Sequence, residues 1–416
     1  MHVLIAGAGI GGLTAALSLH AAGVAAVLVE QVADLRPIGA GINLQPHAVK
    51  ELSELGLAGD LEARSVATAH MSYVDRHGNM IMDVPRGRAA GYRWPQYSIH
   101  RGHLQMLLLD AVRARLGPSA LVTGRAERFE QDHDRVRLHL DDGRVLDGDV
   151  LVGCDGLHSA IRARLHPGEG APLWNGVRMW RGTAAAEPYL DGRTMIVSGA
   201  NKVGKFVCYP IGDGLVNWVA ELRTGTPGPM ARAGWNVTGR HEDVLEHFGD
   251  RRFPWLDVAG LIGRSPQVWE FPMVDRDPLA WWTRGRVTLL GDAAHPMYPI
   301  GSNGGSQTVI DARVLAYHLA TTGSLAAYES ERRAKVNRLV ENHRRMAVEE
   351  ILDEIARRAP GGFGHIDEVL SAEERARLHG FHTRVTDMEV AELNAARSWT
   401  VAGGGPPTST ARTPQP

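Results

Sequence analysis

Three glycines near the start of the chain have the spacing of a turn that can cradle a pyrophosphate. Gly7, Gly9 and Gly12 form the pattern G-x-G-x-x-G. In such a turn the first glycine makes the bend, the second lets the backbone approach the phosphates, and the third lets a helix pack closely on a strand. Glu30 lies 18 residues beyond Gly12, where an acid can accept a hydrogen bond from an adenosine ribose. This spacing predicts a dinucleotide-binding site.

The residues around these glycines predict the elements that such a site needs. Residues 3–6 read as a buried strand, residues 11–22 as a helix, and residues 27–29 as a second strand. The helix would direct its free N–H groups and its positive end at the phosphates. A signal peptide or membrane span is the alternative, because residues 3–29 contain no Asp, Glu, Lys or Arg. No basic segment precedes them and glycines interrupt them, so we favour the dinucleotide site.

Two further strand–turn–helix patterns each place an aspartate where a strand ends. Residues 151–164 contain the turn Asp155-Gly156, and the buried strand 287–290 is followed by Gly291-Asp292 and a helix over 306–319. Ligands bind at the carboxyl ends of parallel strands, so both aspartates are candidate ligand contacts. Asp155 could instead cap the helix after it, and Asp292 could be a plain turn residue.

Composition bounds the class of protein. A chain of 416 residues exceeds one ordinary core, so two domains are expected. The net charge of −2 gives no bias toward nucleic acid or an anionic membrane. Cys154 and Cys208 make no disulfide framework, and no Cys/His cluster has zinc spacing, so we expect no metal. Without a recognisable targeting segment we expect a cytoplasmic protein, and residues 401–416 should be disordered.

Periodicity and turn residues predict the remaining elements. Helices are expected over 47–55, 98–117, 241–262 and 326–358, and strands within 70–83, 121–152, 176–222 and 266–274. His77-Gly78-Asn79 and Asp141-Asp142-Gly143 should be hairpin turns. Residues 85–97 and 223–240 read as loops.

Three separated motifs carry a resemblance to a known family. They are GAGIGG at 7–12, CDGLHSAIR at 154–162 and LLGDAAHPMYPIGSNGGSQ at 289–307. This combination resembles the class A FAD-dependent aromatic monooxygenases over about residues 1–345. Further text, including RPIGAGINLQPHAV and SNGGSQ, is most similar to the phenazine-tailoring branch, which includes a 5-methylphenazine-1-carboxylate monooxygenase.

The resemblance implies a fold, a set of domains and a reaction. The fold would be α/β, a Rossmann-type FAD-binding domain (1–70, 98–175 and 265–335) with a β-sheet substrate domain (71–97 and 176–264), then C-terminal helices over 336–400. FAD, bound without a covalent link, would be reduced by NADH or NADPH. It would hydroxylate an aromatic or heteroaromatic ring with O2 through a flavin C4a-hydroperoxide, with or without decarboxylation. No nucleic acid or membrane partner is implied, and the enzyme would be a monomer or homodimer.

The resemblance also assigns residues to the cofactor. The glycine-rich turn and Glu30 would hold the ADP half of FAD, Arg101 its pyrophosphate or ribityl chain, Ala126 its adenine and Asp292 its ribityl hydroxyls. Asp155 would serve FAD and the transient nicotinamide. The full predicted cofactor set is Gly7, Gly9, Gly12, Glu30, Arg101, Gln105, Ala126, Asp155, Asp292, Pro299, Gly301, Gly304, Gly305 and Ser306. Most relatives have Asn where this chain has Ser306.

A second set of residues could line a flat substrate pocket. Its members are Trp180, Arg181, Tyr209, Trp218, Met273, Met297 and Tyr298. Arg181 stands out because a guanidinium in a β-layer needs a partner, and a substrate carboxylate would pair with it bidentately. A structural carboxylate is the alternative partner. No general base is identifiable, but the Pro299 carbonyl could polarise a substrate hydroxyl that Tyr209 positions.

The alternatives to a monooxygenase are a flavin halogenase, a non-hydroxylating oxidoreductase and a hydrolase. A flavin halogenase would need a lysine between its flavin and substrate sites, and this chain has no lysine between Lys50 and Lys202. A non-hydroxylating FAD-dependent oxidoreductase would carry the same cofactor motifs. His295 follows Asp292 by three residues, but no G-x-S-x-G elbow exists for a hydrolase.

Overall fold

A five-stranded parallel sheet lies in one half of the molecule. The computed structural model describes residues 1–230, 237–345, 347–377 and 389–402. The sheet has the order β20-β12-β1-β2-β8, and its paired strands run parallel. The strands are β1 (His2–Ala6), β2 (Ala25–Glu30), β8 (Leu121–Thr123), β12 (Val150–Gly153) and β20 (Val287–Leu289). Near-continuous apolar runs form these strands because helices cover the sheet.

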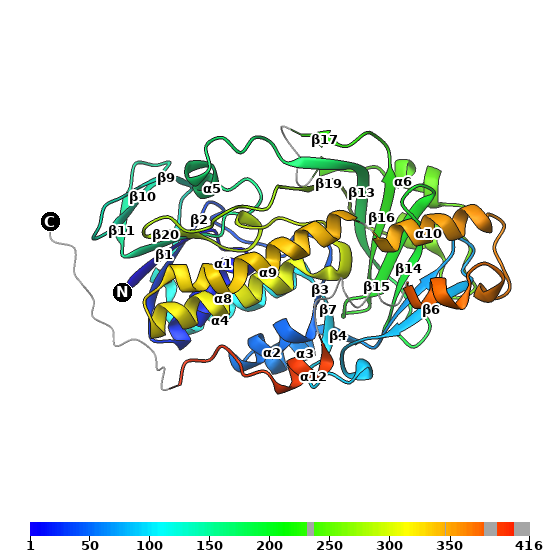
Figure 1. Cartoon of the computed structure of the whole chain (residues 1–416), viewed down its shortest axis with the longest axis horizontal. Helices are drawn as coiled ribbons and strands as arrows, with labels where there is room; N and C mark the ends of the chain where they lie inside the picture. The colour runs from blue at the N-terminus through cyan, green and yellow to red at the C-terminus, as the bar shows by residue number, and fades with distance from the viewer. Residues whose placement is uncertain (231–236, 346, 378–388, 403–416) are drawn as a thin grey trace.

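Helices pack on this sheet and on one another (Figure 1). They are α1 (Ile10–Ala21), α4 (Arg101–Leu116), α8 (Gly304–Thr321), α9 (Leu325–Arg345) and the short α5 (Ala160–Leu165). Helix α1 is apolar around its whole circumference and buried over most of its length, because it lies between α4 and α8. None of the helices in the described residues combines the length and apolar character needed to cross a membrane.

A three-stranded antiparallel sheet projects from the same half. It contains β9 (Ala126–Gln131), β10 (Val136–Leu140) and β11 (Val145–Gly148) in the order β11-β10-β9. The predicted hairpin turn at Asp141-Asp142-Gly143 joins the last two strands, and Gly143 has a φ of 86°. The turn prediction is therefore confirmed.

A nine-stranded sheet fills the other half (Figure 1). Its strand order is β18-β19-β13-β16-β15-β14-β5-β6, with β17 paired to β13. Its strands are β5 (His70–Val74), β6 (Met80–Pro85), β13 (Leu173–Ala185), β14 (Thr194–Ala200), β15 (Gly204–Pro210), β16 (Leu215–Arg223), β17 (Gly228–Pro229), β18 (Val237–Thr238) and β19 (Val268–Asp275). The predicted hairpin at 70–83 is present, since β5 and β6 pair antiparallel across the turn.

The two faces of the nine-stranded sheet are covered differently. Helices α6 (His241–Phe248) and α7 (Val258–Gly263) close one face with an apolar core. The other face packs on α10 (Ala347–Arg358) and on residues 366–370. It also packs, near β13 and β19, on residues 298–300. The second face is therefore the one turned toward the loop that precedes α8.

A small fourth sheet joins the two halves. Strands β3 (Gly41–Leu44), β4 (Ser65–Thr68) and β7 (Gln96–His100) pair antiparallel in the order β3-β7-β4. We expected a helix from residue 98, but the helix begins at Arg101 because residues 96–100 pair with two strands distant in sequence. Helices α2 (Pro46–Glu54) and α3 (Ala58–Ala63) follow β3.

The C-terminal segment returns to the first half. Helix α12 (Val390–Ala395) and residues 396–400 lie against α2 and α8. The Lys50 ammonium group donates to the carbonyls of Ala396 and Arg397. Glu51, which is buried, accepts hydrogen bonds from Ser398 and the Trp399 amide. The tail predicted to be disordered lies, from residue 403, outside the described residues.

The positions of two strands can be compared with the predicted domain boundaries. Strand β19, which we had grouped with the FAD-binding segments, is hydrogen-bonded within the nine-stranded sheet. Strand β13 begins at Leu173, a few residues before the boundary we expected. The parallel sheet with flanking helices confirms the α/β fold class, while the domain boundaries stay a prediction.

Candidate active site

The glycine-rich turn has the space that a pyrophosphate needs. Gly7 has a φ of 102°, and a Cβ there would lie 2.6 Å from the carbonyl oxygen of Cys154. A Cβ on Gly12 would lie 1.9 Å from the Gly7 carbonyl oxygen, whereas one on Gly9 would meet nothing within 4 Å. Gly9 is also the N-cap of α1 and provides no side-chain cap, so the helix N–H groups face the open side. The first and third glycines are required by packing, and the second leaves room for a ligand.

Two predicted cofactor residues hold this turn in place. The Glu30 carboxylate accepts hydrogen bonds from the amides of Ala8, at 2.8 Å, and Val32, at 3.0 Å. The Gln105 side chain donates to the Ala8 carbonyl at 2.9 Å. The backbone of Glu30 also accepts a hydrogen bond from the Gly124 amide, which brings the start of β9, at Ala126, near the end of β2. These residues therefore meet at one edge of the sheet, and their contacts with a cofactor stay a prediction.

Asp155 helps to cap α5, whose N-cap residue is Ser159. Its carboxylate accepts hydrogen bonds from the Ser159 hydroxyl at 2.5 Å and from the amides of Ala160 and Ile161 at 2.7 and 3.3 Å. Burial raises the pKa of Asp155, and these hydrogen bonds oppose that rise. Both oxygens are thus engaged by the first turn of α5, which was the alternative role considered for this residue. A contact with FAD or nicotinamide stays a prediction.

Asp292 is free to bind a ligand. It lies in a 3₁₀ turn (Gly291–Ala293) after β20, its side chain is accessible, and it makes no hydrogen bond with any residue the structure describes. Burial by the surrounding protein nevertheless raises its pKa, while the charges of His295 and Arg101 oppose this. Because Asp292 is exposed although burial raises its pKa, we infer that it lines a cleft. It can accept hydrogen bonds from hydroxyl groups there.

The turn that presents Asp292 is anchored from α8. Asp311 accepts a hydrogen bond from the Gly291 amide at 3.2 Å and pairs with His295 at 2.5 Å. Its other oxygen accepts from Arg332 of α9 at 2.7 Å. Burial alone would raise the pKa of Asp311, but the charges of His295 and Arg332 hold it below the usual value. His295 thus belongs to a buried structural network and not to a nucleophilic triad.

The loop before α8 approaches the same cleft. Gly301 has a φ of 66° and its carbonyl accepts a hydrogen bond from the Gln45 side chain at 3.0 Å. Ser306 is buried, and its hydroxyl accepts from the Gln45 amide at 2.9 Å. Because this hydroxyl is engaged with Gln45, the residue after β3, a predicted flavin contact at Ser306 would have to come from its backbone.

The N-terminus of α8 resembles that of α1 in lacking a side-chain cap. The helix begins at Gly304 and its N-cap, Asn303, makes no side-chain cap. A Cβ on Gly305 would lie 2.7 Å from the Ile42 side chain, so a larger residue would push the helix away from β3. Pro299 is exposed in the preceding turn. Free N–H groups here would favour an anion.

Arg181 and Tyr209 bring the nine-stranded sheet to this cleft. Arg181, on β13, is half-buried and its Nε has no hydrogen-bond partner; its guanidinium lies 6.0 Å from the Phe271 ring. Burial raises the pKa of Tyr209, on β15, to about 12, and the charge of Arg181 opposes this rise. Burial lowers the pKa of Arg101, an effect that Asp292 opposes and Arg181 strengthens. Asp292 and Arg181 are therefore both close enough to Arg101 for their charges to act on it.

A polar network connects Tyr209 to the small sheet. The Asn43 side chain opposes the rise in the pKa of Tyr209 and donates to the Ser302 hydroxyl at 3.4 Å. Its amide oxygen accepts from Ser98 at 2.5 Å, and Ser98 also bonds Thr68. Sequence reasoning missed Asn43, although it lies in the family-like segment around residues 37–49.

The structure corrects the predicted substrate pocket at two residues, Trp180 and Trp218. Side chains alternate along a strand, so Trp180 points to the face opposite Arg181. Both tryptophans are fully buried in the core under α6 and α7, and the Trp218 indole donates to Ser265 at 2.7 Å. They cannot reach a ligand on the other face. They pack the sheet from behind.

The other predicted pocket residues lie on the face of Arg181 or beside it. Met273 and Tyr298 share an apolar cluster with Phe271 and Met179. Burial, and after it the charge of Asp275, raise the pKa of Tyr298. Met297 is half-buried and packs on the core of the parallel sheet. Their contact with substrate stays a prediction.

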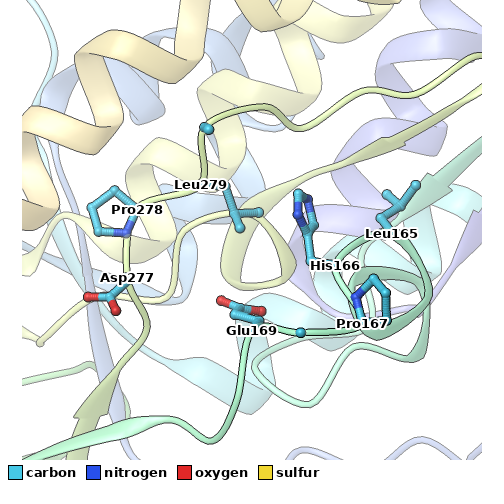
Figure 2. A pocket seen from close by; sticks show the side chains of 9 residues that line it. Leu165, His166, Pro167, Glu169, Asp277, Pro278 and Leu279 are labelled. Carbon is cyan, nitrogen blue, oxygen red and sulfur yellow. The ribbon is translucent and has the colours of Figure 1, made fainter.

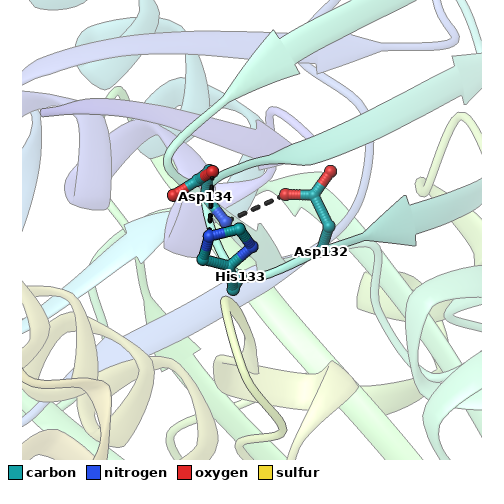
Figure 3. A group of neighbouring side chains, drawn as sticks. All are labelled: Asp132, His133 and Asp134. Carbon is teal, nitrogen blue, oxygen red and sulfur yellow. Dashed lines mark hydrogen bonds and ion pairs between the residues drawn. The ribbon is translucent and has the colours of Figure 1, made fainter.

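Two other clusters lie away from this site. Figure 2 shows residues 165–169 and 277–280, which line a cavity of about 420 Å³. Its two acids are already paired, Glu169 with Arg162 and Arg276, and Asp277 with Arg344. Figure 3 shows Asp132, His133 and Asp134, exposed between β9 and β10. Asp132 accepts hydrogen bonds from the amides of Asp134 and Arg135, which lower its pKa. None of the predicted site residues belongs to either cluster.

Comparison with known proteins shows the family of this chain. Residues 1–181 and 267–343 match the family described as FAD binding domain. The phenazine 1,6-dicarboxylic acid hydroxylase of Lysobacter antibioticus is 45% identical over 361 residues, which cover 82% of this chain and 89% of that protein. The chain belongs to the FAD-dependent aromatic monooxygenases.

Other members of the FAD-dependent aromatic monooxygenases extend this result. The 3-hydroxybenzoate 6-hydroxylase 1 of Aquipseudomonas alcaligenes is 34% identical over 81% of this chain and 86% of that protein. HpxO of Klebsiella pneumoniae, solved with FAD and uric acid, matches with a TM-score of 0.75 and 25% identity, over 92% of this chain and 96% of that one. The resemblance, the fold class and FAD as cofactor are confirmed.

The site fits FAD on its own geometry. Gly9 leaves open space at the N-terminus of α1, and Asp292 offers an unpaired carboxylate in the cleft. The protein is an oxidoreductase that uses FAD, NAD(P)H and O2 to hydroxylate an aromatic ring.

Proposed function

We propose that this monooxygenase hydroxylates a fused, nitrogen-containing aromatic acid of the phenazine type. The relative from Lysobacter, by its name, acts on phenazine 1,6-dicarboxylic acid. The observation that carries the proposal is Arg181, a half-buried guanidinium whose Nε lacks a partner among the described residues. A carboxylate would complete it with two parallel hydrogen bonds.

The residues of the chain would divide the work as follows. FAD, when bound, supplies the redox chemistry: NAD(P)H reduces it and O2 then provides the oxygen atom. Asp292 would accept hydrogen bonds from the ribityl hydroxyls, and the open N-terminus of α8 would favour negative charge on the flavin by about 0.3–2 kcal/mol. Arg181 and Tyr209 would orient the ring, and the Pro299 carbonyl would accept a hydrogen bond from a ring hydroxyl. Met273, Met297 and Tyr298 would line the apolar sides.

We propose the remaining cofactor contacts on the same basis. Gly7, Gly9, Gly12 and Glu30, with Gln105 and Ala126, would enclose the ADP half, and Arg101 would reach the pyrophosphate or ribityl chain. Gly301, Gly304, Gly305 and Ser306 would approach the flavin through their backbone. Asp155 would act on the flavin only through the helix that it caps or during nicotinamide binding.

We also propose the setting of the reaction. The FAD-binding segments would comprise the parallel sheet and its helices, and the nine-stranded sheet would be the substrate domain. The enzyme would work in the cytoplasm, where NADH and NADPH are available, as a monomer or homodimer. Gel filtration with light scattering would determine its oligomeric state.

Product analysis tests the proposed reaction. Holoenzyme supplied with NADH or NADPH and phenazine-1-carboxylate should consume O2 and release a hydroxylated product in equal amounts. Hydroxylation at the carbon that carries the carboxylate would release CO2, and hydroxylation elsewhere would retain it, so the product mass distinguishes the two. Stimulated O2 consumption that yields hydrogen peroxide without hydroxylated product would instead make this protein a non-hydroxylating oxidoreductase.

Replacement of Arg181 tests the carboxylate contact. Arg181→Lys should raise KM for the acid, because an ammonium group cannot reproduce the bidentate geometry, while FAD affinity and melting temperature stay near wild type. Arg178→Lys is the matched control, since Arg178 is an exposed arginine on the same strand that pairs with Glu270. Loss of flavin or early unfolding with an unchanged KM would make Arg181 structural.

A further inference from the structure

Strand β3 contacts the nine-stranded sheet at one end and the turn before α8 at the other. The amide of its first residue, Gly41, donates to the side-chain oxygen of Asn217, on β16, at 2.6 Å. A Cβ on Gly41 would lie 2.7 Å from the Asn217 side chain and 2.8 Å from the Tyr209 ring. The start of β3 therefore packs directly on Tyr209 and Asn217, which pair across β15 and β16.

The hydrogen bond from Gly41 is the only one that the Asn217 side chain makes with the residues that the structure describes. Asn217 is fully buried, and its amide nitrogen has no partner. A buried polar atom without a hydrogen bond costs free energy. The contact with the first residue of β3 is therefore the feature that an asparagine supplies at this position and an apolar residue would not.

The other end of β3 holds a turn with an unfavourable backbone. Gly301 and Ser302 have φ values of 66° and 58°, in the left-handed region. Because Ser302 carries a side chain, its surroundings must maintain this conformation. The side chain of Gln45, the residue after β3, donates to the Gly301 carbonyl at 3.0 Å, and Asn43 donates to the Ser302 hydroxyl at 3.4 Å. Two neighbouring side chains thus bond the two left-handed residues.

The same segment contacts the start of α8. The Gln45 backbone amide donates to the Ser306 hydroxyl at 2.9 Å. A Cβ on Gly305 would lie 2.7 Å from the Ile42 side chain, so β3 lies directly against the helix N-terminus. From Gly41 to Gln45 an extended chain spans roughly 13 Å. β3 is therefore a spacer of fixed length between the nine-stranded sheet and the turn before α8.

We propose that Asn217 and Gln45 are positioning residues for hydroxylation, because they fix the two ends of this spacer. The inference rests on the proposed function, in which Tyr209 contacts the substrate and residues 299–306 approach the flavin. Transfer of oxygen requires the reacting atoms to be aligned at about 3–3.5 Å, and a misplacement of about 1 Å can cost about 100-fold in rate. Release of hydrogen peroxide requires no such alignment. Loss of either end should therefore yield hydrogen peroxide in place of hydroxylated product.

A double-mutant cycle in the flavin-free protein tests the spacer without catalysis. Asn217→Leu and Gln45→Met each remove one end, and substitutions more than about 7–10 Å apart usually have additive effects on stability. Here the double variant should lose clearly less free energy of unfolding than the sum of the two single losses, because breaking either end already releases the strand. Chemical denaturation measures all four proteins, with Asn217→Ala in place of Asn217→Leu if the latter does not fold. Additive losses would overturn the spacer.

Turnover by the holoenzyme, with FAD saturating, tests the positioning role. Asn217→Leu and Gln45→Met should each lower the yield of hydroxylated product per NAD(P)H oxidised by about fivefold or more, with the difference recovered as hydrogen peroxide. The rate of NAD(P)H oxidation should change much less, since it does not depend on alignment of the substrate. A wild-type yield in either variant would overturn the positioning role.

Two matched variants show whether the hydrogen bond itself is responsible. Asn217→Asp keeps an oxygen that can accept from the Gly41 amide, so it should recover most of the yield that Asn217→Leu loses. Asn201 is the control, a buried asparagine between β14 and β15 whose side chain has no hydrogen-bond partner among the described residues. Asn201→Leu should keep the wild-type yield. A yield in Asn217→Asp as low as in Asn217→Leu would also count against the proposal.

The two tests separate this inference from the proposed function. If the wild type does not hydroxylate phenazine-1-carboxylate, the proposed function fails, whereas the denaturation cycle still decides on the spacer. If the wild type hydroxylates it and the variants keep the full yield, the proposed function stands and the positioning role is wrong.

Discussion

Two turns at the same edge of the parallel sheet place an aspartate after a strand, yet they leave it in opposite states. After β12, both carboxylate oxygens of Asp155 accept hydrogen bonds from the start of the helix that follows, α5. After β20, Asp292 is left unbonded by the described residues. The difference arises because Asp311, from α8, holds the second turn in place of Asp292. An acid becomes available to a ligand when another residue takes over the structural role.

We expect the largest loss of stability from replacing Asp311, the residue of α8 that anchors the turn of Asp292. Asp311→Ala should destabilise the protein by about 3–5 kcal/mol, since it leaves Arg332 buried without its partner. FAD affinity should fall as well, because the turn that presents Asp292 loses its anchor. Thermal unfolding of the flavin-free and FAD-bound proteins would measure both effects.

A matched replacement separates charge from shape at this anchor. Asp311→Asn keeps the volume and one acceptor oxygen, so it should lose less stability than Asp311→Ala. Equal stability of Asp311→Ala and the wild type would show that the 291–295 turn does not depend on α8.

The next largest effect should be on cofactor affinity. Asp292→Ala removes the unbonded carboxylate and should weaken FAD binding by about 1–3 kcal/mol, the cost of unmatched hydrogen-bonding groups. Asp155→Ala should change it much less. Fluorescence titration of FAD into each flavin-free variant would give the dissociation constants. Equal constants for the two variants would remove the distinction between the turns.

A smaller effect is expected on stability at the capping turn. Asp155→Ala should lower the free energy of unfolding by about 0.5–2 kcal/mol, the usual cost of a lost helix cap. Asp155→Asn, which retains an acceptor, should recover part of it. Chemical denaturation of the flavin-free proteins would measure the change, and a variant as stable as wild type would mean that α5 does not need this cap.

The smallest expected effect concerns pH. Burial raises the pKa of Asp292 above its unfolded value of 3.8, so its contribution to stability is present below that value and lost as pH rises through the folded pKa. Flavin-free Asp292→Asn should therefore melt slightly above wild type at about pH 7, and the difference should disappear on approach to about pH 4. Scanning fluorimetry across this range would test the sign. A lower melting temperature for the variant at neutral pH would contradict it.

Local patterns in the sequence predicted much of the fold. The strands at 3–6 and 287–290, the glycine-rich turn and the hairpin at 70–83 depend on nearby residues, and all are present. The strand at 96–100 was missed because its pairing with β3 and β4 involves distant segments. Trp180 was placed wrongly because alternation predicts two faces but does not say which of them α6 and α7 cover.

At the candidate site, too, sequence patterns did not predict contacts between residues that are distant in sequence. Spacing identified Asp155 and Asp292 as equivalent candidates, and only the positions of Ser159 and Asp311 distinguish them. Ser306 read as a flavin contact, but its hydroxyl bonds the amide of Gln45, far away in sequence.

The strand order of the parallel sheet has a consequence for synthesis of the chain. β1 lies between β2 and β12, so the first strand to leave the ribosome gains its second neighbour only after about residue 150 has been added. At ordinary rates of translation this takes on the order of ten seconds, during which an apolar strand has an open edge. β20 completes the sheet later still, near residue 289. N-terminal fragments that contain the whole glycine-rich motif should therefore aggregate rather than bind FAD, and nascent chains should need a chaperone until β12 has paired.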